Sequence, residues 1–158
     1  MRENDRSNLG RIGLTLGLLV ALTFGMTGCM ATVPLASAER DAESKQFSTP
    51  PEGKAGVYIY RTSVLGMAVK KKVRMDGTPL GKVAYKTFSY TEVPSGKHTV
   101  STKSEFGYNS LVFTADEGAL YFFEQYLYPG ILIGGSSNFK TVSEEKGKAE
   151  VLMCKQIQ

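Results

Sequence analysis

Residues 119–128 read A-L-Y-F-F-E-Q-Y-L-Y, and this stretch decides the fold that we expect. Large apolar side chains occupy both sets of alternating positions, so both faces of a strand formed here would carry apolar groups. A strand of this composition is typical of the centre of a sheet that is covered on both sides. We therefore predict a central strand over residues 119–128, with structure packed against each of its faces.

Further strands are expected before this segment. Residues 56–61 read G-V-Y-I-Y-R and are rich in β-branched and aromatic residues, which favour strands. In residues 67–75 apolar and basic side chains alternate, so the Lys70–Lys72 run is interpreted mainly as the solvent face of a strand rather than as a polyanion site. The remaining strands are predicted over residues 80–85, 87–93, 98–103 and 111–115.

The segments between these strands carry turn signals. Asp76-Gly77 supplies the positive φ angles of a tight hairpin, and Pro94 fixes φ at the start of the turn Pro94-Ser95-Gly96-Lys97. Turns that recur every eight to twelve residues or so favour an antiparallel β-sandwich or a small barrel. The sequence therefore predicts a mainly β domain, for which we expect the sandwich.

The last residues break the strand pattern. Ser143 followed by Glu144-Glu145 is typical of a helix N-terminus, where a capping hydroxyl and acidic side chains are favourable. We expect a short C-terminal helix, although Gly147 costs about 1 kcal/mol relative to alanine in a helix interior. A final edge strand over residues 149–155 is the alternative.

The N-terminus is typical of an exported protein. Three arginines, at positions 2, 6 and 11, precede Ile12–Met26, a run of uncharged and largely apolar residues. This run is shorter than the roughly 20 residues that a membrane-spanning helix needs, and it fits a signal peptide, which we place over residues 1–28. The sequence Ala36-Ser37-Ala38 offers an ordinary signal-peptidase site, but it lies far beyond the apolar run.

The residues Met26-Thr27-Gly28-Cys29 resemble the bacterial lipobox, which implies that Cys29 becomes the lipidated first residue of the mature chain. Met30 is not aspartate, which resembles the sorting pattern of the outer membrane. The lipid on Cys29 would make the membrane a permanent partner. We therefore expect a lipoprotein of the outer membrane whose domain faces the periplasm, with exposure at the cell surface as the alternative.

Residues 29–54 are predicted to be a lipidated N-terminus and flexible tether, because they are polar and proline-bearing and contain few large apolar residues. The folded domain is placed at residues 55–158. The net charge of +4 gives no reason to expect a nucleic-acid partner.

Few residues in this chain are suited to catalysis. His98 is its single histidine, and Cys154 is the only cysteine besides Cys29. We interpret His98 as structural or solvated and Cys154 as a buried free thiol. No cofactor, metal site or catalytic residue is predicted. A small periplasmic enzyme that uses His98 or Cys154 is the alternative function.

Residues 126–135 form the leading candidate for a contact surface, because their glycines break any regular element while two tyrosines and three large aliphatic residues need burial or a partner. This segment either folds back over an open end of the sandwich as core, which is the interpretation we favour, or is exposed as an apolar contact for envelope proteins, glycan or lipid. The candidate contact residues are Tyr128, Ile131, Leu132 and Ile133.

Four segments together resemble the DUF2846 family of bacterial envelope lipoproteins. They are G-V-Y-I-Y-R at 56–61, M-D-G-T-P-L-G-K at 75–82, V-P-S-G-K-H-T-V at 93–100 and G-A-L-Y-F-F-E at 118–124. Ser95, which separates Pro94 from Gly96, is a departure from the turn of that family. The resemblance implies a sandwich similar to transthyretin-like and PEGA-type domains, and no assigned activity. The function we expect is a membrane-tethered, non-catalytic binding or scaffold module.

Overall fold

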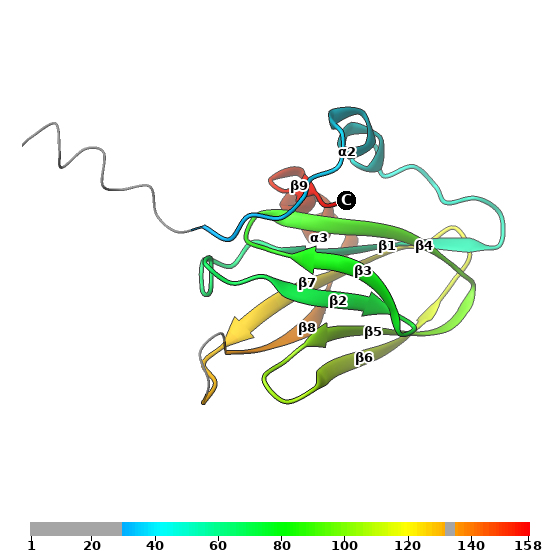
Figure 1. The fold of residues 1–158 in the computed structure, drawn as a ribbon. Helices are drawn as coiled ribbons and strands as arrows, with labels where there is room; N and C mark the ends of the chain where they lie inside the picture. Colours follow the sequence, from blue (N-terminus) through cyan, green and yellow to red (C-terminus); the bar gives the residue numbers. More distant parts are fainter. Residues whose placement is uncertain (1–29, 132–134) are drawn as a thin grey trace, which may run out of the picture.

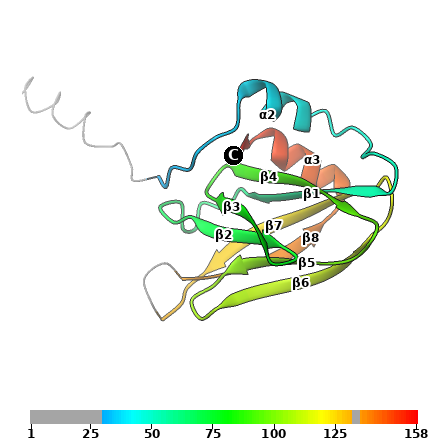
Figure 2. The same cartoon turned by 45° about the vertical axis from the view of Figure 1, so that its right-hand side comes forward.

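The computed structural model describes residues 30–131 and 135–158, and the signal peptide predicted over residues 1–28 lies outside them. Within the described residues, two sheets face each other and two helices cover the outer face of one sheet (Figures 1 and 2). The larger sheet has the order β8-β7-β1-β4-β9 and the smaller sheet the order β3-β2-β5-β6. The predicted β-sandwich with a short C-terminal helix is therefore confirmed.

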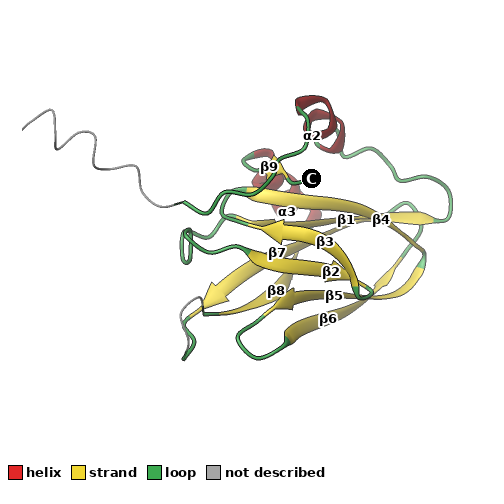
Figure 3. Cartoon of the chain, in the orientation of Figure 1, coloured by secondary structure: helices red, strands yellow, loops and turns green. Residues whose placement is uncertain are grey.

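Strands make up most of the secondary structure, as Figure 3 shows. Their bounds are β1 (Lys54–Arg61), β2 (Lys71–Met75), β3 (Thr78–Val83), β4 (Thr87–Pro94), β5 (Gly96–Lys103), β6 (Tyr108–Ala115), β7 (Leu120–Tyr128), β8 (Ser136–Val142) and β9 (Lys155–Gln156). The helices are α2 (Ala38–Ser44) and α3 (Glu144–Leu152). The hairpin predicted at Asp76-Gly77 joins β2 to β3, and both of its residues have positive φ.

Strand β7 is a central strand, as its composition predicted. Phe123 faces the smaller sheet and joins the core between the two sheets, while Phe122 faces the helices and joins a second core. β7 pairs with β8 antiparallel but with β1 parallel, and β9 also pairs with β4 in the parallel sense. The larger sheet is therefore mixed rather than antiparallel throughout. The relative direction of strands so distant in the chain depends on the whole topology, not on local sequence.

Helix α3 begins as predicted, because the Ser143 hydroxyl caps its N-terminus by accepting a hydrogen bond from the Lys146 N–H. Gly147 lies against the ring of Phe122, and a β-carbon at this position would overlap that ring. The glycine therefore allows the close approach of α3 to β7. The helix ends at Leu152, and β9 follows it as a two-residue edge strand.

Strand β2 is shorter than predicted. It begins at Lys71, so Met67 and Val69 lie in the preceding loop. Lys72 is exposed as expected, but Lys71 is buried, and its Nζ donates a hydrogen bond of 2.7 Å to the Gly135 carbonyl. The basic run is thus the solvent face of a strand in part only.

The flexible tether predicted for residues 29–54 is wrong over most of its length. Ser37 caps helix α2, and the Asp41 carboxylate accepts hydrogen bonds from the Gln156 backbone N–H and from Lys45. Phe47 packs against Tyr58 at 5.4 Å between ring centroids. The segment is ordered by contacts with distant residues, and its own low apolar content gave no sign of them.

No helix among the described residues is long and apolar enough to cross a bilayer.

Candidate functional site

Three loops meet at one end of the sandwich, beside the first described residues (Figures 1 and 2). Strands β1, β5 and β7 end there and strands β2, β6 and β8 begin there, as their pairing requires. We define the loop end as residues 30–32, 62–70, 104–107 and 128–131. It brings together segments that are up to about a hundred residues apart in the chain.

The loop end carries most of the exposed apolar side chains of the described residues. Eleven large hydrophobic residues are exposed in the described part of the chain, and seven of them belong to the loop end. These seven are Met30, Val64, Leu65, Met67, Phe106, Tyr128 and Ile131. The apolar side chains are therefore concentrated rather than scattered, and this concentration makes the loop end our candidate interaction surface.

The predicted contact segment forms part of this surface. Ile131 is 88% exposed and Tyr128 is 40% exposed, while Leu132 and Ile133 lie outside the described residues. The interpretation of the segment as core is wrong for Ile131. Phe106 is 74% exposed and was missed by the sequence analysis, as were Val64 and Leu65, because isolated apolar residues in a loop give no sign that the fold will group them.

Arg61 fixes the first of the three loops. It lies at the end of β1 with no exposed surface, and its Nη2 donates hydrogen bonds to the carbonyls of Val69 and, at 3.5 Å, Gly66. Burial lowers the pKa of this guanidinium to about 10, so the group stays charged at neutral pH. Arg61 therefore ties the end of β1 to the carbonyls of the β1–β2 loop.

Two further ties connect the loops to each other. The Glu105 carboxylate accepts a hydrogen bond of 3.1 Å from the Ile131 backbone N–H, which joins the β5–β6 loop to the β7–β8 loop. Lys71 bonds to the Gly135 carbonyl, which joins the start of β2 to the start of β8. The exposed apolar residues thus project from loops that hydrogen bonds hold in place.

A buried polar layer supports the loop end from below. Gln125 donates a hydrogen bond of 2.7 Å to the Thr102 hydroxyl, which lies 2.9 Å from the Ser137 hydroxyl, and Ser137 in turn donates to the Lys103 carbonyl. This chain of bonds links β7, β5 and β8 between the sheets. It fixes the positions from which two of the three loops leave the sandwich.

The N-terminal segment reaches the loop end in a fixed position. The Ala31 N–H donates a hydrogen bond of 3.0 Å to the Met67 carbonyl, and Lys70 Nζ donates one of 3.0 Å to the Thr32 carbonyl. Further along, Leu35 forms a bridge with Ile157 at the edge of the larger sheet. Cys29, the predicted lipidation residue, lies outside the described residues but is the direct chain neighbour of Met30.

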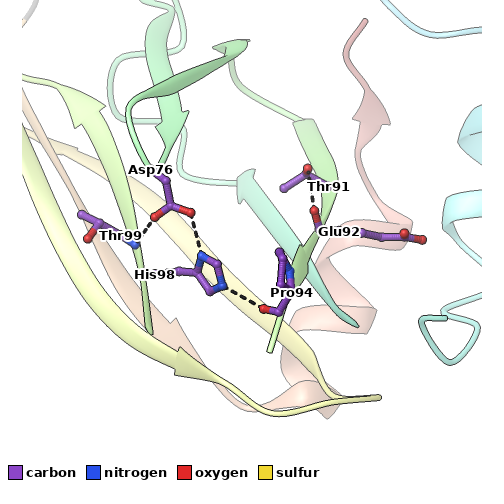
Figure 4. A network of polar contacts seen from close by, with 6 residues as sticks. All are labelled: Asp76, Thr91, Glu92, Pro94, His98 and Thr99. Carbon is purple, nitrogen blue, oxygen red and sulfur yellow. Dashed lines mark hydrogen bonds and ion pairs between the residues drawn. The ribbon is translucent and has the colours of Figure 1, made fainter. Parts of the chain in front are cut away.

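His98 lies at the opposite end of the sandwich from these loops. Its Nδ1 is 2.6 Å from the Asp76 carboxylate and its Nε2 is 2.8 Å from the Pro94 carbonyl, as Figure 4 shows. The Asp76 carboxylate and the Pro94 carbonyl are both acceptors, so this geometry favours the imidazolium form of the ring, in which both nitrogens carry hydrogen. The hydrogen bond to Asp76 also raises the pKa of His98, against the opposing effect of burial. His98 thus connects the β2–β3 turn and the end of β4, and a purely structural role for it stays a prediction.

Cys154 is a buried free thiol, as predicted. It lies in the core between the larger sheet and the helices, and burial raises the pKa of the thiol to about 12. His98 instead contacts Phe113, at the side of the core between the sheets, so the structure does not bring the two candidate catalytic residues together. Among the described residues, no group of three His, Cys, Asp or Glu side chains could hold a metal ion.

Comparison with known proteins identifies the family of the chain. The model of the DUF2846 family, described as a protein family of unknown function, matches residues 51–136, which span β1 to the start of β8. The chain belongs to the DUF2846 family. An uncharacterised Haemophilus influenzae protein is 38% identical over 133 residues, which cover 84% of this chain and 78% of that protein. The similarity to it therefore extends beyond the segment matched by the DUF2846 model.

A solved structure is also similar to part of the chain. It is the N-terminal domain of AlgF from P. aeruginosa, with 21% identity and a TM-score of 0.40. The alignment covers 60% of this chain and 99% of that domain.

Proposed function

We propose that this DUF2846 protein is a lipoprotein of the bacterial envelope, in which Cys29 carries the lipid and the sandwich is a non-catalytic binding or scaffold module. The observation that carries this proposal is the position of the N-terminal segment. Ala31 and Thr32 are bonded to the β1–β2 loop, so Met30 alone separates Cys29 from residues that are fixed to the domain. A lipid on Cys29 would hold the domain against the membrane rather than at the end of a long tether.

The chemistry of the two reactive side chains favours a non-catalytic role. A general base needs a free lone pair, and both nitrogens of His98 face acceptors that require them to donate. A nucleophilic cysteine needs an accessible thiolate, whereas Cys154 is buried with a raised pKa. The outer membrane is the proposed location because Met30, not aspartate, follows the predicted lipidation residue.

Metabolic labelling tests the anchor. Cells that express the chain are grown with an alkyne fatty acid, and the label is detected on the purified protein. We expect the wild type to be labelled and Cys29→Ser to lose the label completely, because a hydroxyl does not replace the thiol in lipid transfer. Cys154→Ala is the matched control, which should keep the label. A labelled Cys29→Ser protein would contradict the proposal.

A further inference from the structure

The loop end exposes apolar side chains on three separate loops, which limits the partners that it fits. Val64 and Leu65 project from one loop, Phe106 from a second and Ile131 from a third, and all four are more than half exposed. Exposed apolar side chains on three separate loops suit the broad, deformable apolar boundary of a lipid bilayer. The transfer of such side chains from water to the boundary of a lipid bilayer is favourable, because it lowers the free energy.

The position of the proposed anchor indicates which apolar environment the loop end meets. Met30 is exposed, belongs to the loop end, and directly follows the residue that we propose to be lipidated. Acyl chains attached at Cys29 must enter the bilayer within one residue of this surface. The loop end is therefore the part of the domain that an anchored chain brings to the membrane.

The polar residues around the loop end suit the same partner. Lys70 and Lys103 flank the apolar tips, and Glu105 is the one acidic residue within the loop-end segments. Lysines next to a membrane-contacting surface interact favourably with the anionic headgroups of a bilayer. Tyr128, which is 40% exposed, has the amphipathic ring that is enriched at membrane interfaces.

We infer that the loop end docks on the lipid bilayer, with the side chains of Leu65, Phe106 and Ile131 in its interface. This inference rests on the proposed lipid anchor and goes beyond it, because an anchor alone leaves the domain free to tumble above the membrane. Docking fixes one orientation. It places the turns at Asp76-Gly77 and Asp116-Glu117 at the end that faces away from the lipid.

A fluorescent probe on the full lipidated chain tests docking. Phe106→Cys is labelled with an environment-sensitive dye and the protein is reconstituted into vesicles of phosphatidylethanolamine and phosphatidylglycerol. Val112→Cys is the matched control, because Val112 is exposed on β6 outside the loop end. Native Cys154 is buried and should not react. We expect lipid-borne nitroxide to quench the dye at position 106 and leave the dye at position 112 unaffected.

Negative charge on the other two loops should prevent docking and therefore the quenching. Leu65→Glu combined with Ile131→Glu is expected to abolish quenching at position 106, with an unchanged melting curve, since both side chains are exposed. Equal quenching at both dyes, or at neither, in a chain that still floats with the vesicles would overturn docking and leave the anchor intact. Shielding of position 106 only when envelope proteins are added would also overturn it, in favour of a protein partner. A chain that carries no lipid and does not float would instead contradict the proposed function, and docking with it.

Discussion

At the scale of single residues, the pair of His98 and Asp76 gives the single histidine of the chain a contact between a turn and a strand. The pair joins the β2–β3 turn to the start of β5, and the Thr99 N–H also donates to Asp76. Burial opposes ionisation of Asp76, but the hydrogen bonds from His98 and Thr99 together lower the pKa of this carboxyl. The pair therefore ties the β2–β3 turn to the start of β5.

This pair predicts a pH dependence of stability. The raised pKa of His98 stabilises the fold below about pH 6.5, its unfolded value, and this contribution is lost as the pH rises through the folded pKa. The lowered pKa of Asp76 stabilises the fold above about pH 4 and is lost as the pH falls through its own folded value. The pair therefore contributes most between these limits.

Asp76→Asn tests this dependence, since asparagine also tolerates the positive φ of the turn. We expect it to lower the free energy of unfolding by at most about 1 kcal/mol near pH 5.5, because the Asp76 side chain is nearly half exposed and the pair is screened. The difference from the wild type should shrink near pH 8.5. Thermal unfolding at both pH values measures it, and a difference that grows with pH would contradict the assignment.

Gly147 provides a second prediction at this scale. Alanine would gain about 1 kcal/mol in helix propensity, but its β-carbon would overlap the Phe122 ring, and overpacking costs about 1–3 kcal/mol. We expect Gly147→Ala to be destabilising in denaturant melts. In a Phe122→Ala background the same substitution should be neutral or stabilising. A stabilising effect in the wild-type background would show that α3 does not pack closely on β7.

At the scale of elements, the N-terminal segment is the largest difference between expectation and structure. Its helix is held by a bond from Gln156 to Asp41 across 115 residues, and its one large aromatic residue packs into the helix-side core. No local pattern predicts such contacts. Strand β7, the Asp76-Gly77 hairpin and the cap of α3 were predictable because each depends on neighbouring residues alone. Strand β8 was missed because S-S-N-F-K-T-V has little apolar alternation.

The corrected role of this segment predicts that its aromatic residue stabilises the domain. We expect Phe47→Ala to lower the free energy of unfolding by about 2–3 kcal/mol, since the ring contacts both Tyr58 and Phe122. Ser48→Ala, at the next and exposed position, is the control and should change it by less than about 0.5 kcal/mol. Equal effects of the two substitutions on the free energy of unfolding would instead support the flexible tether that the sequence predicted.

At the scale of the whole molecule, the fold separates two chemically different ends. The strand directions collect apolar loop tips and the start of the described chain at one end, and acidic turns together with the His98–Asp76 pair at the other. The sequence indicated one part of the apolar surface, the segment around Ile131. The rest depends on topology, because Val64, Leu65 and Phe106 are brought together only when β1, β5 and β7 end at the same edge.

The most direct test of an anchored and oriented domain is photocrosslinking from the lipid itself. The lipidated chain is reconstituted into vesicles that contain a photoreactive phospholipid, irradiated, digested and mapped by mass spectrometry. The account predicts that lipid adducts fall on peptides that contain residues 62–70, 104–107 and 128–131. Adducts spread evenly over the surface, or concentrated on the turns at Asp76-Gly77 and Asp116-Glu117, would contradict it.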